Sequence, residues 1–147
     1  MFVSVSDAVL LKEKTGPSKA NQHYQVLALE VVTSMIAQGL KPGDSMVIAF
    51  YKAEVRGLKR LFRANKIDVE VATVDSTQGG EKEFVVVDMV TPAMRKAPLG
   101  LLRLPERLNV ALSRARSGRI VIGDADMKNI EKKSAGNEQA YQKLDDV

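Results

Sequence analysis

The segment from Phe84 to Val90 is an almost unbroken run of apolar residues, and it limits the possible folds more than any other part of the sequence. A strand with one face in water alternates apolar and polar residues, whereas a strand covered on both faces is apolar throughout. The run is far shorter than the roughly 20 apolar residues that span a membrane. It therefore predicts a central strand with other elements packed on both faces of the sheet.

Short apolar segments alternate with helical patterns along the rest of the chain. We expect strands over residues 2–5, 46–50, 69–74, 84–90 and 119–123, and helices over residues 21–40, 52–64 and 105–116. Residues 11–20 and 91–104 are expected to be loops, and Gly118 to terminate the third helix. Strands that alternate with helices predict an α/β fold, with a mainly parallel sheet flanked by helices on both faces.

In the first expected helix, apolar residues recur at helical spacing and predict the face that is buried. They are Val26, Leu29, Val32, Ile36 and Leu40. In a parallel sheet of this kind, ligands bind beyond the carboxyl ends of the strands. The segments after Phe50, after Val74 and before the third helix are therefore the first places to look for a site.

The composition excludes several classes of site. The chain has no cysteine and a single histidine, His23, which excludes disulfides, thiolate metal sites and a histidine-based catalytic triad. We expect no metal ligands in the chain, no membrane segment, and a reducing location in the cytoplasm or nucleus. The net charge of +4 suits a polyanionic partner, but it is equally ordinary for a slightly basic soluble domain.

The segment from Thr73 to Glu81 follows an expected strand and is rich in hydrogen-bonding residues. It contains Ser76, Thr77 and Gln78, followed by two glycines that allow backbone N–H groups to approach an anion. These features suit a phosphate-binding turn. The alternative is an ordinary polar connection whose side chains satisfy the local backbone.

The third expected helix carries arginines at positions that share one edge. Arg107 and Arg114 are two helical turns apart, and Arg116 is expected on the far side of the helix. A guanidinium is always charged and can bind phosphate oxygens in bidentate fashion. The alternative is that these arginines are good helix formers near the negative end of a helix.

The helix expected over residues 52–64 has cations on one face and apolar residues on the other. The cations, called the basic face below, are Lys52, Arg56, Lys59, Arg60 and Arg63. Such a face could follow a phosphate backbone, or it could be an ordinary solvated surface. The sequence also lacks the G-x-x-x-x-G-K-[ST] phosphate loop and an acidic pair after a strand, so the chain is not expected to hydrolyse ATP alone.

Two of these segments resemble motifs of the superfamily 1 helicases, closest to the nonsense-mediated-decay RNA helicase and its DNA2-like and senataxin-like relatives. Residues 74–84 resemble motif V, residues 107–116 resemble motif VI, and the resemblance covers roughly residues 1–124. It implies a RecA-like P-loop NTPase fold, specifically the second helicase domain, over residues 1–125. Residues 126–147 would be a polar tail or short helix.

The resemblance also implies a role for individual residues. Arg114 would contact the γ-phosphate of ATP as an arginine finger, while Glu81 would contact the nucleotide sugar and Gln78 and Gly79 would lie beside the phosphates. Arg107 would support the motif VI helix or the phosphate site. The region around Tyr51 and Ser76 would face a single strand of RNA or DNA, and Lys52 and Arg56 of the basic face are expected to bind the same strand. ATP and Mg²⁺ would be held mainly by an N-terminal RecA-like domain of the same, monomeric protein.

The sequence departs from the family pattern at three places. Ala49-Phe50-Tyr51 stands where the family often has Thr-Pro-Tyr. Thr77 stands where the family usually has an aromatic residue, and Gly80 where it usually has a basic or other side chain. These departures motivate an alternative in which the domain is a non-catalytic platform for nucleic acid or protein. A small α/β enzyme unrelated to helicases is a third reading, which the motif VI resemblance disfavours.

Overall fold

Five parallel strands form the centre of the computed structural model, which describes residues 2–4, 11–12, 19–77, 80–90 and 105–123. The strand order is β1-β7-β6-β4-β5, and every neighbouring pair in this sheet is parallel. The strands are β1 (Phe2–Ser4), β4 (Ser45–Ala49), β5 (Glu70–Thr73), β6 (Lys82–Asp88) and β7 (Ala115–Gly123). The prediction of a parallel α/β sheet is confirmed.

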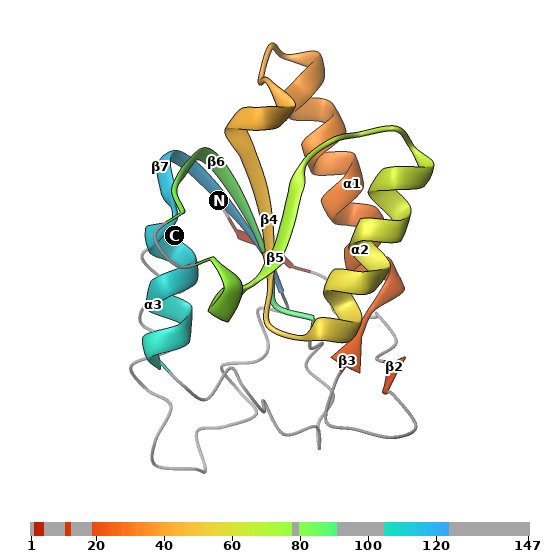
Figure 1. Ribbon diagram of the computed structural model, residues 1–147, viewed down its shortest axis with the longest axis vertical. Coiled ribbons are helices and arrows are strands. Elements are labelled where there is room, and N and C mark those ends of the chain that lie inside the picture. Colours follow the sequence, from red (N-terminus) through yellow and green to blue (C-terminus); the bar gives the residue numbers. More distant parts are fainter. Residues whose placement is uncertain (1, 5–10, 13–18, 78–79, 91–104, 124–147) are drawn as a thin grey trace.

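Helices cover both faces of this sheet, as predicted. Figure 1 shows α1 (Gln22–Ala37) and α2 (Lys52–Ala64) together on one side, and α3 (Pro105–Ser113) on the other. Two short 3₁₀ turns, η1 (Pro42–Asp44) and η2 (Val74–Ser76), precede β4 and follow β5. The expected loop over residues 11–20 also contains two very short antiparallel strands, β2 (Leu11–Lys12) and β3 (Lys19–Ala20).

The core lies where the sequence places it, around β6. Val85, Val86 and Val87 are fully buried, because α1 packs on one face of β6 and α3 on the other. β4 beside it is also buried along its whole length. This explains why both strands read as continuous apolar runs rather than alternating ones.

The buried face of α1 differs from the predicted stripe. Tyr24, Ala28 and Val32 are fully buried, whereas Val26 is 47% exposed. Burial of the large Tyr24 ring removes more apolar surface from water than burial of Val26 would, and the small Ala28 lets the helix lie close to the sheet. Of the predicted stripe, Val32 is fully buried and Leu29, Ile36 and Leu40 pack against the core, so the prediction is wrong only at Val26.

The boundary between α3 and β7 also differs from prediction. α3 ends at Ser113, and β7 begins at Ala115 instead of residue 119. The backbone N–H of Lys82 donates to the carbonyl of Arg114 at 2.9 Å, so pairing with β6 takes over from helical bonding. Gly118 lies within β7 and does not end the helix. A Cβ there would stand 3.0 Å from Cδ2 of Phe84, so any larger residue would force the ring to shift by a few tenths of an ångström.

Two predicted segments lie outside the described residues: the loop over residues 91–104 and the polar tail over residues 126–147. Within the described part of the chain, no helix combines the length and apolar character that crossing a membrane requires.

Candidate functional site

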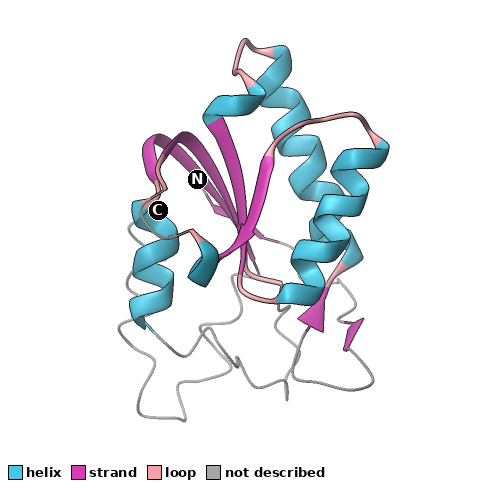
Figure 2. Ribbon diagram, in the orientation of Figure 1, coloured by secondary structure: helices cyan, strands magenta, loops and turns pink. Residues whose placement is uncertain are grey.

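The connection from β5 to β6 lies beside α3. β5 and β6 stand on opposite sides of β4, so the chain after Thr73 must pass across the sheet to begin β6. η2 forms the first part of this connection and contacts α3 (Figure 2). The segments that resemble motifs V and VI are therefore neighbours in space, which places the arginines of one against the turn of the other.

Arg107, in the first turns of α3, forms an ion pair with Asp75 of η2. The Arg107 side chain is 22% exposed and that of Asp75 is 66% exposed, so the pair lies at the surface. Nε of Arg107 is buried and has no hydrogen-bond partner among the described residues. The carboxylate of Asp75 thus fixes one end of the guanidinium, while part of its donor capacity is unused.

Arg114 follows the last residue of α3 and reaches back to the same connection. Its Nη1 donates to the carbonyl oxygen of Gly80 at 3.4 Å, and its Nε is buried without a partner among the described residues. Within that part of the chain no carboxylate pairs with Arg114. Its positive charge is held against the motif V turn by a neutral acceptor and retains capacity for an anion.

Arg116 lies in β7, not on the helix as expected, and it ties β7 to the start of β6. Its Nε is 3.3 Å from Oε2 of Glu81, and its Nη1 is 3.7 Å from Oε1 of Glu83. Ser117 adds a hydrogen bond of 2.6 Å to the second oxygen of Glu83. Glu81 is therefore engaged by a cation at the surface. Because both partners are about half exposed, this pair contributes little to stability.

The residues expected to face a nucleic-acid strand fall into two groups. Lys52 and Arg56 are exposed on α2, and Ser76 is exposed on η2, where its hydroxyl donates to the Thr73 carbonyl at 3.1 Å. Tyr51, in contrast, is only 5% exposed and belongs to the core. Its ring is not presented to a strand at the surface.

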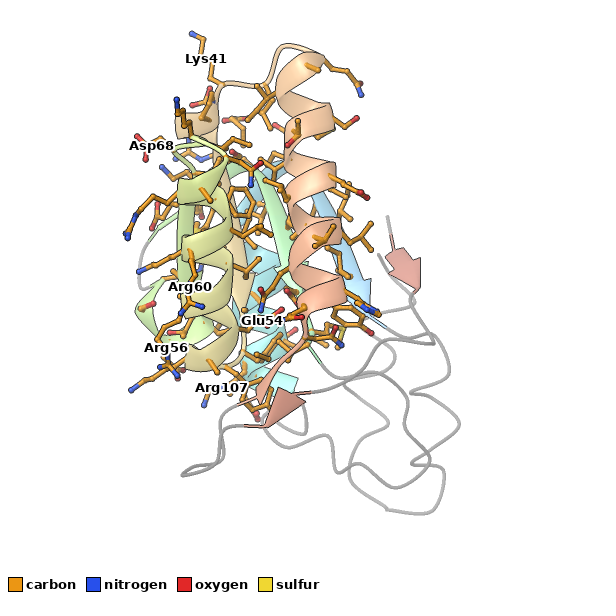
Figure 3. All side chains as sticks on the ribbon, turned by 90° about the vertical axis from the view of Figure 1, so that its right-hand side faces the viewer. Lys41, Glu54, Arg56, Arg60, Asp68 and Arg107 are labelled. Carbon is orange, nitrogen blue, oxygen red and sulfur yellow. The ribbon has the colours of Figure 1, made fainter. Side chains whose placement is uncertain are left out.

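The whole basic face of α2 points away from the sheet. All five of its cations are exposed, and Figure 3 shows Arg56 and Arg60 directed outward. The predicted apolar face is also observed, with Val55, Leu58 and Phe62 buried against the sheet. The geometry supports a continuous cationic surface along this helix.

The departures from the family pattern fit their local surroundings. Ala49 is fully buried, and Thr77 is buried with its hydroxyl donating to the Val74 carbonyl at 2.7 Å. A Cβ at Gly80 would meet only the Thr77 carbonyl, at 3.6 Å, so a side chain would fit there. Gln78 and Gly79 lie outside the described residues. Within the described ranges, no group of three acidic or histidine side chains could hold a metal ion.

One buried polar cluster is missing from the sequence prediction. Glu54 of α2 and Asp88 of β6 are both fully buried, and Glu54 accepts hydrogen bonds from Asn21 and Gln25 at the start of α1. The signal was present in the sequence. Asp88 ends an apolar strand, and Glu54 falls on the apolar face of its helix, next to Val55 and one turn before Leu58.

Comparison with known proteins agrees with the fold and the motifs. The family model described as an AAA domain matches residues 1–126. An uncharacterized ATP-dependent helicase of Methanocaldococcus jannaschii is 36% identical over 131 residues, which cover 89% of this chain and 19% of that protein.

Two further relatives come from fungi. A DNA replication ATP-dependent helicase/nuclease of Saccharomyces cerevisiae is 36% identical over 125 residues, covering 84% of this chain and 8% of the relative. A regulator of nonsense transcripts 1 homolog of Neurospora crassa is 33% identical over 117 residues, covering 75% and 11% respectively. The chain therefore spans about a fifth or less of the length of these relatives.

The parallel α/β sheet, with its motif V turn set against the motif VI helix, defines a helicase-like domain of the RecA-like class. Within that class, the chain belongs to the superfamily 1 helicases, in the group of the DNA2-like and nonsense-mediated-decay enzymes.

Proposed function

We propose that this chain is the second RecA-like domain of an ATP-dependent superfamily 1 helicase, and that it supplies an arginine finger to ATP bound by the first domain. The observation that carries the proposal is the position of Arg114. Its guanidinium lies against the motif V turn, held by the Gly80 carbonyl and not by a carboxylate of the described residues. A charge held in this way is available to a phosphate.

In this mechanism, ATP and Mg²⁺ bind mainly to the first domain, and this domain closes over them. Arg114 stabilises the charge that develops on the transferred phosphoryl group, an effect worth about 10³–10⁵ in rate. Glu81, Gln78 and Gly79 lie at the nucleotide, and Arg107 supports the same turn through Asp75. Mg²⁺ supplies charge neutralisation at the phosphates when it is bound.

The nucleic-acid surface in this proposal runs from Ser76 to the basic face of α2. Lys52 and Arg56 bind phosphates of a single strand, while Tyr51 supports the start of the helix from within the core. Opening and closing of the two domains moves this surface relative to the first domain's strand contacts, which gives stepping along RNA or DNA. A helicase of this kind is expected to act inside the cell.

The test is Arg114→Ala in the full-length protein, with ATP hydrolysis and ATP binding measured separately. We expect kcat to fall by about 10³-fold or more while ATP binding remains near wild type. Lys41→Ala removes an exposed cation outside the site and is expected to leave both unchanged. Wild-type turnover in the Arg114 variant would show that this residue is not the finger.

The competing proposal is a non-catalytic platform, motivated by Ala49, Thr77 and Gly80. Because all three residues fit locally without strain, the structure offers no sign of damage at these positions. The two proposals differ in the region that precedes this domain in the full-length protein. An intact phosphate loop there favours the motor, and its loss favours the platform.

A further inference from the structure

Two carboxyl groups are buried together where α2 begins and β6 ends. Glu54 lies in the first turn of α2 and Asp88 is the last residue of β6, and both are fully buried. Figure 3 shows Glu54 directed between α2 and α1, away from the outward-pointing Arg56 and Arg60. Two ionised carboxylates in such a place repel one another and lose their hydration, so the pair needs another source of stability.

The hydrogen bonds of the pair account for one oxygen of each carboxyl. Oε2 of Glu54 accepts from the Asn21 backbone N–H at 2.7 Å and from Nε2 of Gln25 at 2.8 Å. Oδ1 of Asp88 accepts from the Val90 N–H at 2.9 Å. The remaining oxygens, Oε1 of Glu54 and Oδ2 of Asp88, are buried and have no donor among the described residues.

Each of these two oxygens lacks a donor, and a proton held by one carboxyl and shared with the other would supply it, because an ionised carboxylate only accepts. Burial raises the pKa of Asp88 well above its usual range, and the negative charge of Glu54 raises it further. Burial also raises the pKa of Glu54, against the lowering effect of the hydrogen bonds that it accepts from Gln25 and Asn21. Glu54 accepts two hydrogen bonds that favour its ionised form and Asp88 accepts one, so Asp88 is the carboxyl that holds the proton.

The pair is connected to a strained turn. Val90 has a φ of +66°, which is costly for a β-branched residue, and it is fully buried. Asp88 accepts its N–H, while Nδ2 of Asn21 donates to its carbonyl at 3.2 Å. Asn21 in turn caps α1 by accepting from the N–H groups of His23 and Tyr24. One hydrogen-bonded cluster therefore connects the start of α1, the start of α2 and the residues that follow β6.

We propose that Glu54 and Asp88 share a single proton that locks these three elements together, so that this end of the sheet loosens when the proton is lost. The groups that act on the pair are the neutral side chains of Asn21 and Gln25 from the α1 side, the Val90 backbone from β6, and the two carboxyls themselves. Loss of the proton leaves two adjacent buried negative charges. This shared proton, called the shared-proton latch below, is proposed independently of the helicase activity.

The sign of the pH effect follows from the raised pKa of both carboxyls. A protonated pair is favoured in the folded state, so the stabilisation is complete below about pH 4, where the unfolded carboxyls also hold protons. It declines as the pH rises above that value, and is gone once the pH passes the raised pKa of Asp88. The free energy of unfolding should therefore decrease as the pH rises above about 4.

The experiment compares thermal unfolding of the wild-type chain and Asp88→Asn between pH 5 and pH 10. The new amide still accepts from Val90 and donates to Glu54 at every pH, so its melting temperature should rise relative to wild type as the pH increases. For a domain of this size, each unit by which folding raises the pKa of Asp88 corresponds to a difference of about 3–5 °C in melting temperature. Asp68→Asn, the same change at an exposed aspartate, should follow the wild type.

Parallel curves for the wild type and Asp88→Asn would overturn the shared-proton latch. Glu54→Gln is a second variant, expected to flatten the pH dependence in the same way. If neither variant folds, infrared spectra of wild-type protein with ¹³C-carboxyl aspartate decide the matter. A protonated carboxyl band at neutral pH supports the latch, and its absence contradicts it, whatever the ATPase experiments show.

Discussion

At the scale of single residues, the buried positions are determined by contacts that cross between elements. Gly118 is the clearest example, because it reads in the sequence as a helix terminus but lies in β7 against the ring of Phe84. Its spacing after the helix is consistent with either role. Only the pairing of β7 with β6, which brings Phe84 opposite Gly118, distinguishes them.

Gly118→Ala is expected to destabilise the fold by about 1–3 kcal/mol, because the added methyl would force the Phe84 ring to move within a packed core. Chemical denaturation of the variant measures this directly. Gly43→Ala serves as control, since a Cβ there meets nothing within 4 Å. Equal stabilities for the two variants would show that the ring yields without cost.

At the scale of elements, the sequence predicts type and order well and boundaries less well. α2 begins and ends where its amphipathic pattern predicts, because its basic and apolar faces are cleanly separated. α1 has a less clear separation, and its buried face is set by Tyr24 and by the cap at Asn21. Which face of α1 is buried depends on the sheet that it packs against. The spacing of apolar residues along the helix carries no information about that sheet.

Asn21→Ala should be among the more damaging single changes in α1. It removes the acceptor for two backbone N–H groups of the first turn and the donor to Val90, at a cost of about 2 kcal/mol or more. Asn65→Ala at the exposed C-terminal cap of α2 is the matched control, expected to cost much less. Urea unfolding of both variants gives the comparison, and similar losses would mean that the Asn21 cluster contributes no more than an exposed cap.

At the scale of the whole molecule, the parallel sheet and the order of motifs follow from the sequence, but the arrangement of the site follows only in part. Motif spacing predicts that Arg107 and Arg114 share an edge, and both contact the residue 74–80 connection. It did not predict that Tyr51 is buried or that Glu81 pairs with Arg116. The Glu81–Arg116 pair depends on where β6 and β7 begin, and the burial of Tyr51 depends on how the start of α2 packs on the core.

The basic face should act through charge if it binds a single strand. Replacing Lys52 and Arg56 with Ala is expected to weaken binding to an unstructured oligonucleotide and to reduce the salt slope by about 1.4, since each lost phosphate contact contributes about 0.7. The control replaces Lys41 and Lys66, two exposed cations off this face. Fluorescence anisotropy over a salt series tests it, and equal slopes for both pairs would make the face an ordinary solvated surface.

The isolated chain is expected to show no ATP hydrolysis above background, because its sequence has no phosphate loop to hold the nucleotide phosphates. A phosphate-release assay with and without oligonucleotide measures this. Adding the separately produced first domain should restore some hydrolysis if the site is shared between the two. Robust turnover by this chain alone would contradict a split site.

The most direct test of the central claim is the affinity of the full-length protein for a transition-state mimic, ADP with aluminium fluoride, against its affinity for ADP. Arg114 is proposed to stabilise charge that develops only as the phosphoryl group is transferred. Arg114→Ala should therefore weaken binding of the mimic by orders of magnitude, with ADP binding nearly unchanged. If both affinities stay at their wild-type values, Arg114 does not act on the transferred phosphate and the account fails.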